Sequence, residues 1–240
     1  MKGKKRSMGS VASRKEPSRL LALSDCLFAT VLTLLVLDLR APETLSYARG
    51  TIHGFFAWIG PRLFAYVLTF LVSGNYWLTH HRDFDHIEGY DRGLLGYNLV
   101  FLLFIGLLPF STAAISAASL VSGLYSFYWA IYAGNLILAG VMLGLTWNYA
   151  VSHRLIKPET SVKQIRHISS RQVVTPSIFA VSIVGQYLFP TVFLGPYILL
   201  SIPVAMWFVD RFLAPPLQRK DGEPRSRRLL WGQAEYSLGC

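Results

Sequence analysis

The sequence predicts an all-α integral membrane protein with six transmembrane helices. Hydrophobic residues make up 52% of the 240 residues, the mean hydropathy is +0.40, and only 15% of the residues are charged. Charged residues make up about a quarter of an ordinary soluble domain. The charges here are also segregated, because long uncharged stretches alternate with short, densely charged ones. This pattern is typical of a chain that is solvated mostly by lipid.

A membrane-spanning helix needs about 20 largely apolar residues. The first apolar segment, 20–39, directly follows a basic tail, and the second, 55–78, contains only Arg62 near its start. The third and fourth segments are 94–115 and 125–147. The last two, 173–189 and 192–212, are separated by little more than Pro190. Five spans with a re-entrant segment are therefore the main alternative to six.

The placement of lysine and arginine predicts the orientation, since these residues favour cytosolic loops. All but three of the 23 basic residues lie before the first span, after the second, after the fourth, or after the sixth. The exceptions are Arg40, Arg49 and Arg62. We therefore expect cytosolic tails at 1–19 and 214–240 around a transmembrane domain at 20–213. The net charge of +10 reflects this topology, and we expect no nucleic-acid partner.

No pattern of catalytic or metal-binding residues is present. The sequence contains neither a convincing nucleophile with its base nor an H-E-x-x-H pair. The segment from His80 to His86 is rich in His and Asp, but its spacing fits no closed metal site. Cys26 and Cys240 cannot form a disulfide framework. We therefore expect no enzyme activity, no metal and no cofactor.

Polar residues gather where the first three spans meet the predicted cytosolic boundary. A carboxylate such as Asp25 is costly within a lipid-spanning helix and usually finds a partner. Arg19 lies six residues from Asp25, so the two side chains point in different directions from one helix. Each must then reach a neighbouring helix. The expected packing network consists of Arg19, Ser24, Asp25, Trp77, His80, His81 and Asn98.

These residues resemble the lysosomal potassium channel family named transmembrane protein 175, which has many bacterial members. The family signature Arg-x-x-x-Phe-Ser-Asp is present as Arg19, Leu23 in place of Phe, Ser24 and Asp25. The resemblance covers about the first 115 residues, while the later spans match only in hydropathy and spacing. It continues through Phe28-Ala29, Thr33 to Asp38, Asn75 to His81, Asn98 to Phe104, and Leu108-Pro109-Phe110.

The resemblance implies a homotetramer in a lipid bilayer, with the first helix of each six-helix subunit lining a central pore for potassium ions. The sequence has no Thr-Val-Gly-Tyr-Gly segment, so it offers no carbonyl selectivity filter. Thr30, Leu34 and Leu37 share one helical face, with Thr33 beside them. The family places bulky aliphatic constrictions at these positions, and Thr30 departs from the usual Ile or Leu. Ordinary helix packing is the alternative explanation of this face.

Asp38 ends the first span. Four copies would form an acidic collar that concentrates cations, or Asp38 would instead pair with Arg40. The alternative function is a secondary transporter of a cation or small solute, which typically carries its charges near mid-membrane at broken helices. The charged motif here lies at the membrane boundary. The short six-span form resembles bacterial members of the family, so we expect a bacterial plasma membrane.

Overall fold

The computed structural model describes residues 18–39, 52–118, 124–190, 194–199 and 201–213, and these form helices joined by short turns. The predicted all-α class is confirmed, because the described residues form helices and no β-strand, with isolated bridge positions at Ile87, Tyr90 and Ile156. The helices are α1 (Ser18–Leu34), η1 (Leu35–Leu39), α2 (Ile52–Asp85), α3 (Arg92–Gly106), α4 (Leu108–Ala118), α5 (Tyr125–Ser152), α6 (Val162–Leu188), α7 (Leu194–Leu199) and α8 (Ser201–Leu213).

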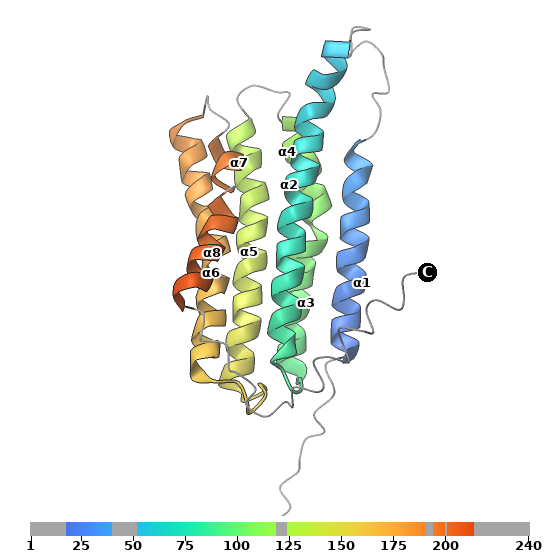
Figure 1. Ribbon diagram of the computed structural model, residues 1–240. Coiled ribbons are helices and arrows are strands. Elements are labelled where there is room, and N and C mark those ends of the chain that lie inside the picture. Colours follow the sequence, from blue (N-terminus) through green and yellow to red (C-terminus); the bar gives the residue numbers. More distant parts are fainter. Residues whose placement is uncertain (1–17, 40–51, 119–123, 191–193, 200, 214–240) are drawn as a thin grey trace, which may run out of the picture.

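The helices run side by side in alternating directions (Figure 1). α1 lies at one edge of the bundle against α2 and α3, and α6 to α8 lie at the other edge. α5 packs against α3, α4 and α6 and so forms the centre. We call the end that carries Ser18, Asp85 and Arg92 the basic end, and the end that carries Leu39, Ala118 and Tyr125 the opposite end.

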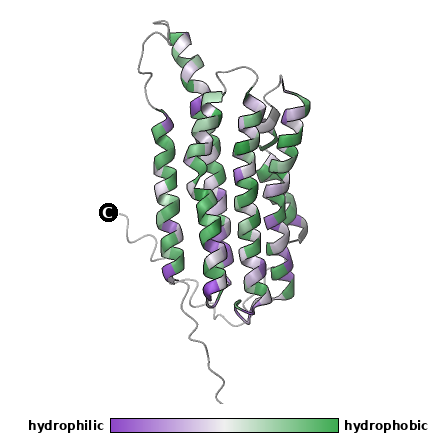
Figure 2. Ribbon diagram, turned by 180° about the vertical axis from the view of Figure 1, so that it is seen from behind, coloured by the Kyte–Doolittle hydropathy of each residue, from purple (hydrophilic) through white to green (hydrophobic). Residues whose placement is uncertain are grey.

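Hydrophobic residues predominate along most of the length of the helices (Figure 2). Large hydrophobic side chains such as Leu71, Leu103 and Val181 are more than half exposed. Polar side chains such as Thr69, His80 and Asn98 are fully buried instead. This distribution suits a protein whose solvent is lipid, in which polar groups must find partners inside the bundle.

In the part of the chain that the structure describes, four helical segments are long and apolar enough to cross a membrane: Ser18–Leu39, Ile52–Asp85, Arg92–Ala118 and Tyr125–Ser152. The third comprises α3 and α4, which are separated by a turn at Leu107, just before Pro109. A proline lacks the amide hydrogen and restricts the residue before it, which explains the interruption. The bundle thus supports a multi-helix membrane protein, and the count of six spans stays a prediction.

The last two predicted spans differ from the observed helices. α6 begins at Val162, eleven residues before the expected start at Val173. Ser161 caps this helix. Its hydroxyl accepts a hydrogen bond from the Gln164 backbone N–H, and the Gln164 side-chain oxygen accepts one from the Ser161 backbone N–H. Only the second part of α6 is apolar. The segment expected at 192–212 forms the shorter helices α7 and α8.

At the basic end, two turns are joined by backbone hydrogen bonds. The Glu88 amide donates to the Leu155 carbonyl, and the Lys157 amide donates to the His86 carbonyl. This pairing ties the α2–α3 turn to the α5–α6 turn. Residues 1–17 of the predicted N-terminal tail 1–19 and the whole predicted C-terminal tail 214–240 lie outside the described residues, as does Arg40.

Candidate functional site

α1 and η1 present one buried face to the rest of the subunit. Leu20, Ser24, Phe28, Val31 and Leu35 are each at most 3% exposed. Their spacing of four, four, three and four residues places them on one side of a helix. α2 and α3 pack against α1, and α2 and α4 pack against η1. This face is therefore the one that anchors α1 in the subunit.

The four predicted constriction residues lie away from that buried face. Thr30 and Thr33 are exposed in the subunit, and Leu34 and Leu37 are 43% and 50% exposed. Cys26 is exposed one turn closer to the basic end. Packing inside the subunit therefore does not explain this stripe. A stripe of threonine and leucine that the subunit leaves uncovered is available to other subunits or to a pore.

The helix tightens where the two leucines lie. From Leu35 onward the chain forms the 3₁₀ segment η1. In a 3₁₀ helix, side chains three residues apart are nearly eclipsed and the rise is about 2 Å per residue. Leu34 is the last residue of α1 and Leu37 lies in η1, so the tighter turn between them reduces the angular offset of their side chains. The sequence reading assumed an uninterrupted α-helix, which would offset them.

The two threonine hydroxyls are oriented by their own helix. Thr30 donates to the Cys26 carbonyl over 2.8 Å, and Thr33 donates to the Thr30 carbonyl over 2.8 Å. Each hydroxyl proton is therefore engaged on the backbone. The oxygen lone pairs remain directed away from the helix, where they can accept. A row of such oxygens suits a cation rather than an anion.

A chain of buried hydrogen bonds locks α1 to α3 and α2. The Ser24 hydroxyl donates to the Leu20 carbonyl and accepts from the Asn98 amide nitrogen, over 3.0 and 3.2 Å. The Asn98 Oδ1 atom lies 2.8 Å from His80 Nε2. All three polar side chains are fully buried. A single asparagine thus joins three helices.

Aromatic rings hold His80 in place. The imidazole stacks on Phe84 at 4.3 Å between centroids and on Phe101 at 5.4 Å. Phe28 of α1 lies 6.3 Å away in a tilted arrangement. The Nδ1 atom is buried without a hydrogen-bond partner. These phenylalanines were not among the predicted site residues, although Phe84 lies one helical turn after His80 and Phe28 one turn after Ser24.

Asp25 and Trp77 form a second contact between α1 and α2. The Trp77 indole Nε1 atom donates to Asp25 Oδ1 over 2.8 Å. His81 lies against the Trp77 ring at 5.7 Å between centroids. Six of the seven predicted network residues are therefore brought together in two groups. The seventh, Arg19, is exposed at the start of α1 and joins neither group.

Asp38 lies in η1 at the opposite end and is partly buried. One carboxylate oxygen, Oδ2, is buried and has no hydrogen-bond partner. The predicted partner Arg40 lies outside the described residues. Among the residues that the structure describes, no three His, Cys, Asp or Glu side chains are grouped as metal ligands.

Comparisons with known proteins identify several relatives of this chain. Residues 19–109 match the family model described as "Endosomal/lysosomal potassium channel TMEM175". A potassium channel of Chryseobacterium sp. (strain P1-3) is 25% identical over 191 residues, which cover 80% of this chain and 92% of that protein. A potassium channel of Streptomyces collinus is 37% identical over 102 residues, 42% of this chain and 48% of that protein.

A solved structure shows the same fold. It is the crystal structure of a lysosomal potassium-selective channel TMEM175 homologue from Chamaesiphon minutus, with a TM-score of 0.64 and 21% identity. The alignment covers 81% of this chain and 95% of that one. The family is one of ion channels, so the expectation that the chain is not an enzyme is confirmed. Residues 19–109 of this chain are therefore similar to the TMEM175 family, and the bacterial relatives that it matches are named potassium channels.

Proposed function

We propose that the protein is one subunit of a potassium-permeable cation channel that conducts passively. Four copies surround a central pore, and the outward stripe of Thr30, Thr33, Leu34 and Leu37 lines it. The observation that carries the proposal is the exposure of this stripe in the isolated subunit, opposite the face that anchors α1. The names of the bacterial relatives, which are potassium channels, support the choice of ion.

Selectivity in such a pore arises from dehydration. The stacked layers at Leu34 and Leu37 form a narrow apolar ring that forces an ion to shed water, and potassium loses water at lower cost than sodium. The Thr30 and Thr33 oxygens lie next to this ring and offer partial replacement for the lost water. The Thr30 layer is wetter than an isoleucine layer would be, so the main barrier lies at the leucines.

We place the basic end in the cytosol and propose six spans, with α6 as the fifth and α7–α8 as the sixth. Arginines and lysines such as Arg82, Arg92, Arg154 and Lys157 lie at the basic end, and Arg62 lies toward the opposite end. This asymmetry is the usual signal for cytosolic loops. On this proposal, both chain termini lie in the cytosol of a bacterial cell.

The test is ion flux from proteoliposomes that contain the purified protein, with sodium as the comparison ion. We expect passive potassium flux that exceeds sodium flux, and we expect Leu34→Trp to abolish it. Leu103→Trp, on the exposed surface of α3, is the matched control and should leave flux intact. Flux that persists in Leu34→Trp would remove the stripe from the pore. Saturable uptake coupled to a second ion would favour a transporter.

A further inference from the structure

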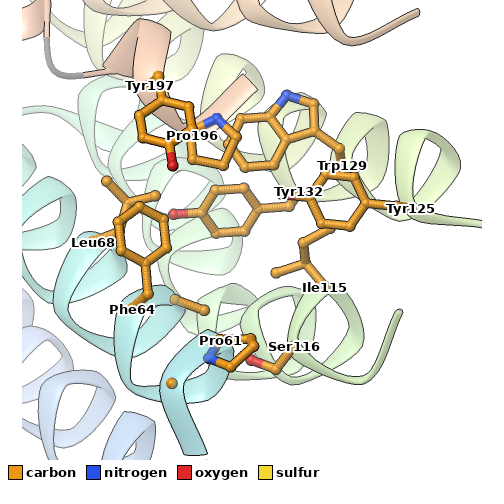
Figure 3. Close-up of a pocket in the computed structure, with 12 residues that line it drawn as sticks. Pro61, Phe64, Leu68, Ile115, Ser116, Tyr125, Trp129, Tyr132, Pro196 and Tyr197 are labelled. Atoms are coloured by element: carbon orange, nitrogen blue, oxygen red, sulfur yellow. The ribbon is translucent and has the colours of Figure 1, made fainter. Parts of the chain in front are cut away.

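The bundle contains a second feature that the ion pathway does not use. A pocket with a volume of about 420 Å³ lies near the opposite end, between α2, α4, α5 and α7 (Figure 3). Its volume falls in the range of small-molecule sites, roughly 300–1,000 Å³. Tyr132 lies at the centre of the lining side chains, with Trp129 and Pro196 on one side of it and Ile115 on the other. We propose that this pocket binds the acyl chain of a membrane phospholipid.

The lining is mainly apolar. Most of it is hydrocarbon, from Gly60, Pro61, Phe64, Ala65, Leu68 and Ile115, with aromatic rings above. The polar atoms of Tyr132 and Trp129 already have partners. The Tyr132 hydroxyl bonds Thr69 at 3.0 Å, and the Trp129 indole donates to Ser182 over 3.3 Å. An occupant therefore gains from apolar contact and finds few polar anchors.

The position of the pocket selects a lipid chain among apolar occupants. Phe64 and Tyr197 line the pocket and are also exposed on the outside, at 47% and 60%. The pocket therefore opens to the surroundings between α2 and α7. The neighbouring surface of α2 is apolar as well, with Leu63 and Val67 nearly half exposed. Acyl chains are the bulk solvent at such a surface, and an apolar cavity is a poor site for water.

A tryptophan inside the pocket makes occupancy measurable. Trp129 is 1% exposed, so a lipid that merely surrounds the subunit cannot touch its ring. Brominated acyl chains quench tryptophan fluorescence on contact. We would reconstitute the full-length protein in phosphatidylcholine whose acyl chains carry bromines either near the headgroup (upper chain) or near the terminal methyl group (lower chain). Unbrominated phosphatidylcholine is the comparison. The reference variant is Trp129→Phe.

We expect upper-chain bromines to quench an emission component that Trp129→Phe lacks. Trp147 is equally buried but lies near the basic end, bonded to Ser169, so Trp147→Phe should leave the quenched component unchanged. Ala65→Phe fills the pocket and should abolish quenching of Trp129. Gly60→Leu is a second filling variant, because a Cβ at Gly60 would meet no atom within 4 Å. Far-ultraviolet circular dichroism, which reports the helix content, checks that each variant folds.

Three outcomes would overturn the proposal. Equal quenching of the wild-type protein and Trp129→Phe would show that no brominated chain reaches the pocket, as when a neighbouring subunit covers it. Quenching of Trp129 that survives both filling variants would place the lipid elsewhere. Quenching by a brominated free fatty acid, but not by the brominated phospholipid, would identify a different source of the chain. None of these readouts depends on ion flux, so the proposal stands or falls separately from the channel assignment.

Discussion

The Trp77 indole donates a hydrogen bond of 2.8 Å to the Asp25 carboxylate and so joins α2 to α1 at the basic end. Polar contacts between membrane helices are worth about 1 kcal/mol. We predict that Asp25→Ala mainly damages assembly, whereas Asp25→Asn keeps an acceptor and is milder. Size-exclusion chromatography of the purified variants measures the fraction of the protein that is tetrameric. Fully assembled Asp25→Ala tetramers with normal flux would contradict this role.

Asn98 bridges Ser24 and His80 inside the bundle. Replacing it by alanine leaves His80 Nε2 without its partner in a fully buried site, which costs about 1–3 kcal/mol per unsatisfied group. We predict that Asn98→Ala melts at a clearly lower temperature in detergent. Asn148→Ala, an exposed position on α5, is the control and should melt like the wild type. Equal melting of the two variants would mean that the bridge contributes nothing.

Thr30 departs from the aliphatic residue that the family usually has at this position. Thr30 is exposed in the subunit, and its hydroxyl proton is bonded to the Cys26 carbonyl. We predict that Thr30→Ile adds a third apolar layer below the leucines and lowers potassium flux from proteoliposomes. Thr30→Ser keeps the hydroxyl and serves as the control. Higher flux in Thr30→Ile than in the wild type would show that Thr30 is not part of the barrier.

Asp38 tests the acidic collar. We predict that Asp38→Asn lowers cation conductance at low salt and that the difference shrinks at high salt, since surface potentials are screened. Conductance of reconstituted channels across a salt series measures both effects. Glu159→Gln removes an acid near the basic end, beyond α5, and should change little. Unchanged conductance with reduced thermal stability would favour an ion pair with Arg40.

Asp91 caps α3 and predicts a pH effect on stability. Its Oδ1 accepts from the Leu94 amide and its Oδ2 from the Tyr149 hydroxyl, at 2.8 and 2.9 Å. Burial opposes ionisation, but these hydrogen bonds outweigh it and lower the pKa of Asp91. A lowered pKa stabilises the folded state above the ordinary Asp pKa of about 3.9, and the gain is lost as the pH falls through the folded-state pKa.

We therefore predict that the wild type loses more stability than Asp91→Asn when the pH falls from neutral to below 4. Thermal unfolding of the two proteins across this range measures the difference. Asp91→Ala should also be destabilised at neutral pH by about 1 kcal/mol, because the helix cap is lost. Parallel pH profiles for wild type and Asp91→Asn would contradict the assignment.

The sequence predicted the helical class and the first four membrane segments because their apolar runs are long. It also indicated which polar residues gather near one end. It missed the early start of α6, since Lys163 and Arg166 resemble a loop in any hydropathy window. It missed the 3₁₀ segment at Leu35, because nothing in Leu-Val-Leu-Asp-Leu differs from an α-helical run.

The partners within the polar group could not be read from sequence either. Helical spacing shows that Asp25 and Arg19 diverge, but it does not show that Trp77 faces Asp25 while Arg19 stays exposed. That choice depends on the rotation of α1 against α2, which the buried Phe28 and Val31 fix through packing. Residue patterns give the faces of a helix, and tertiary packing decides which neighbour each face meets.

The central claim is that the outward stripe of α1 lines the pore, and the native Cys26 tests it most directly. Cys26 lies on this stripe, one turn below Thr30, and is exposed in the subunit. In a Cys240→Ser background, we would add a charged methanethiosulfonate reagent from the cytosolic side and record potassium flux. We expect rapid loss of flux, no loss in Cys26→Ser, and recovery on reduction. Undiminished flux while mass spectrometry shows Cys26 fully labelled would contradict the claim.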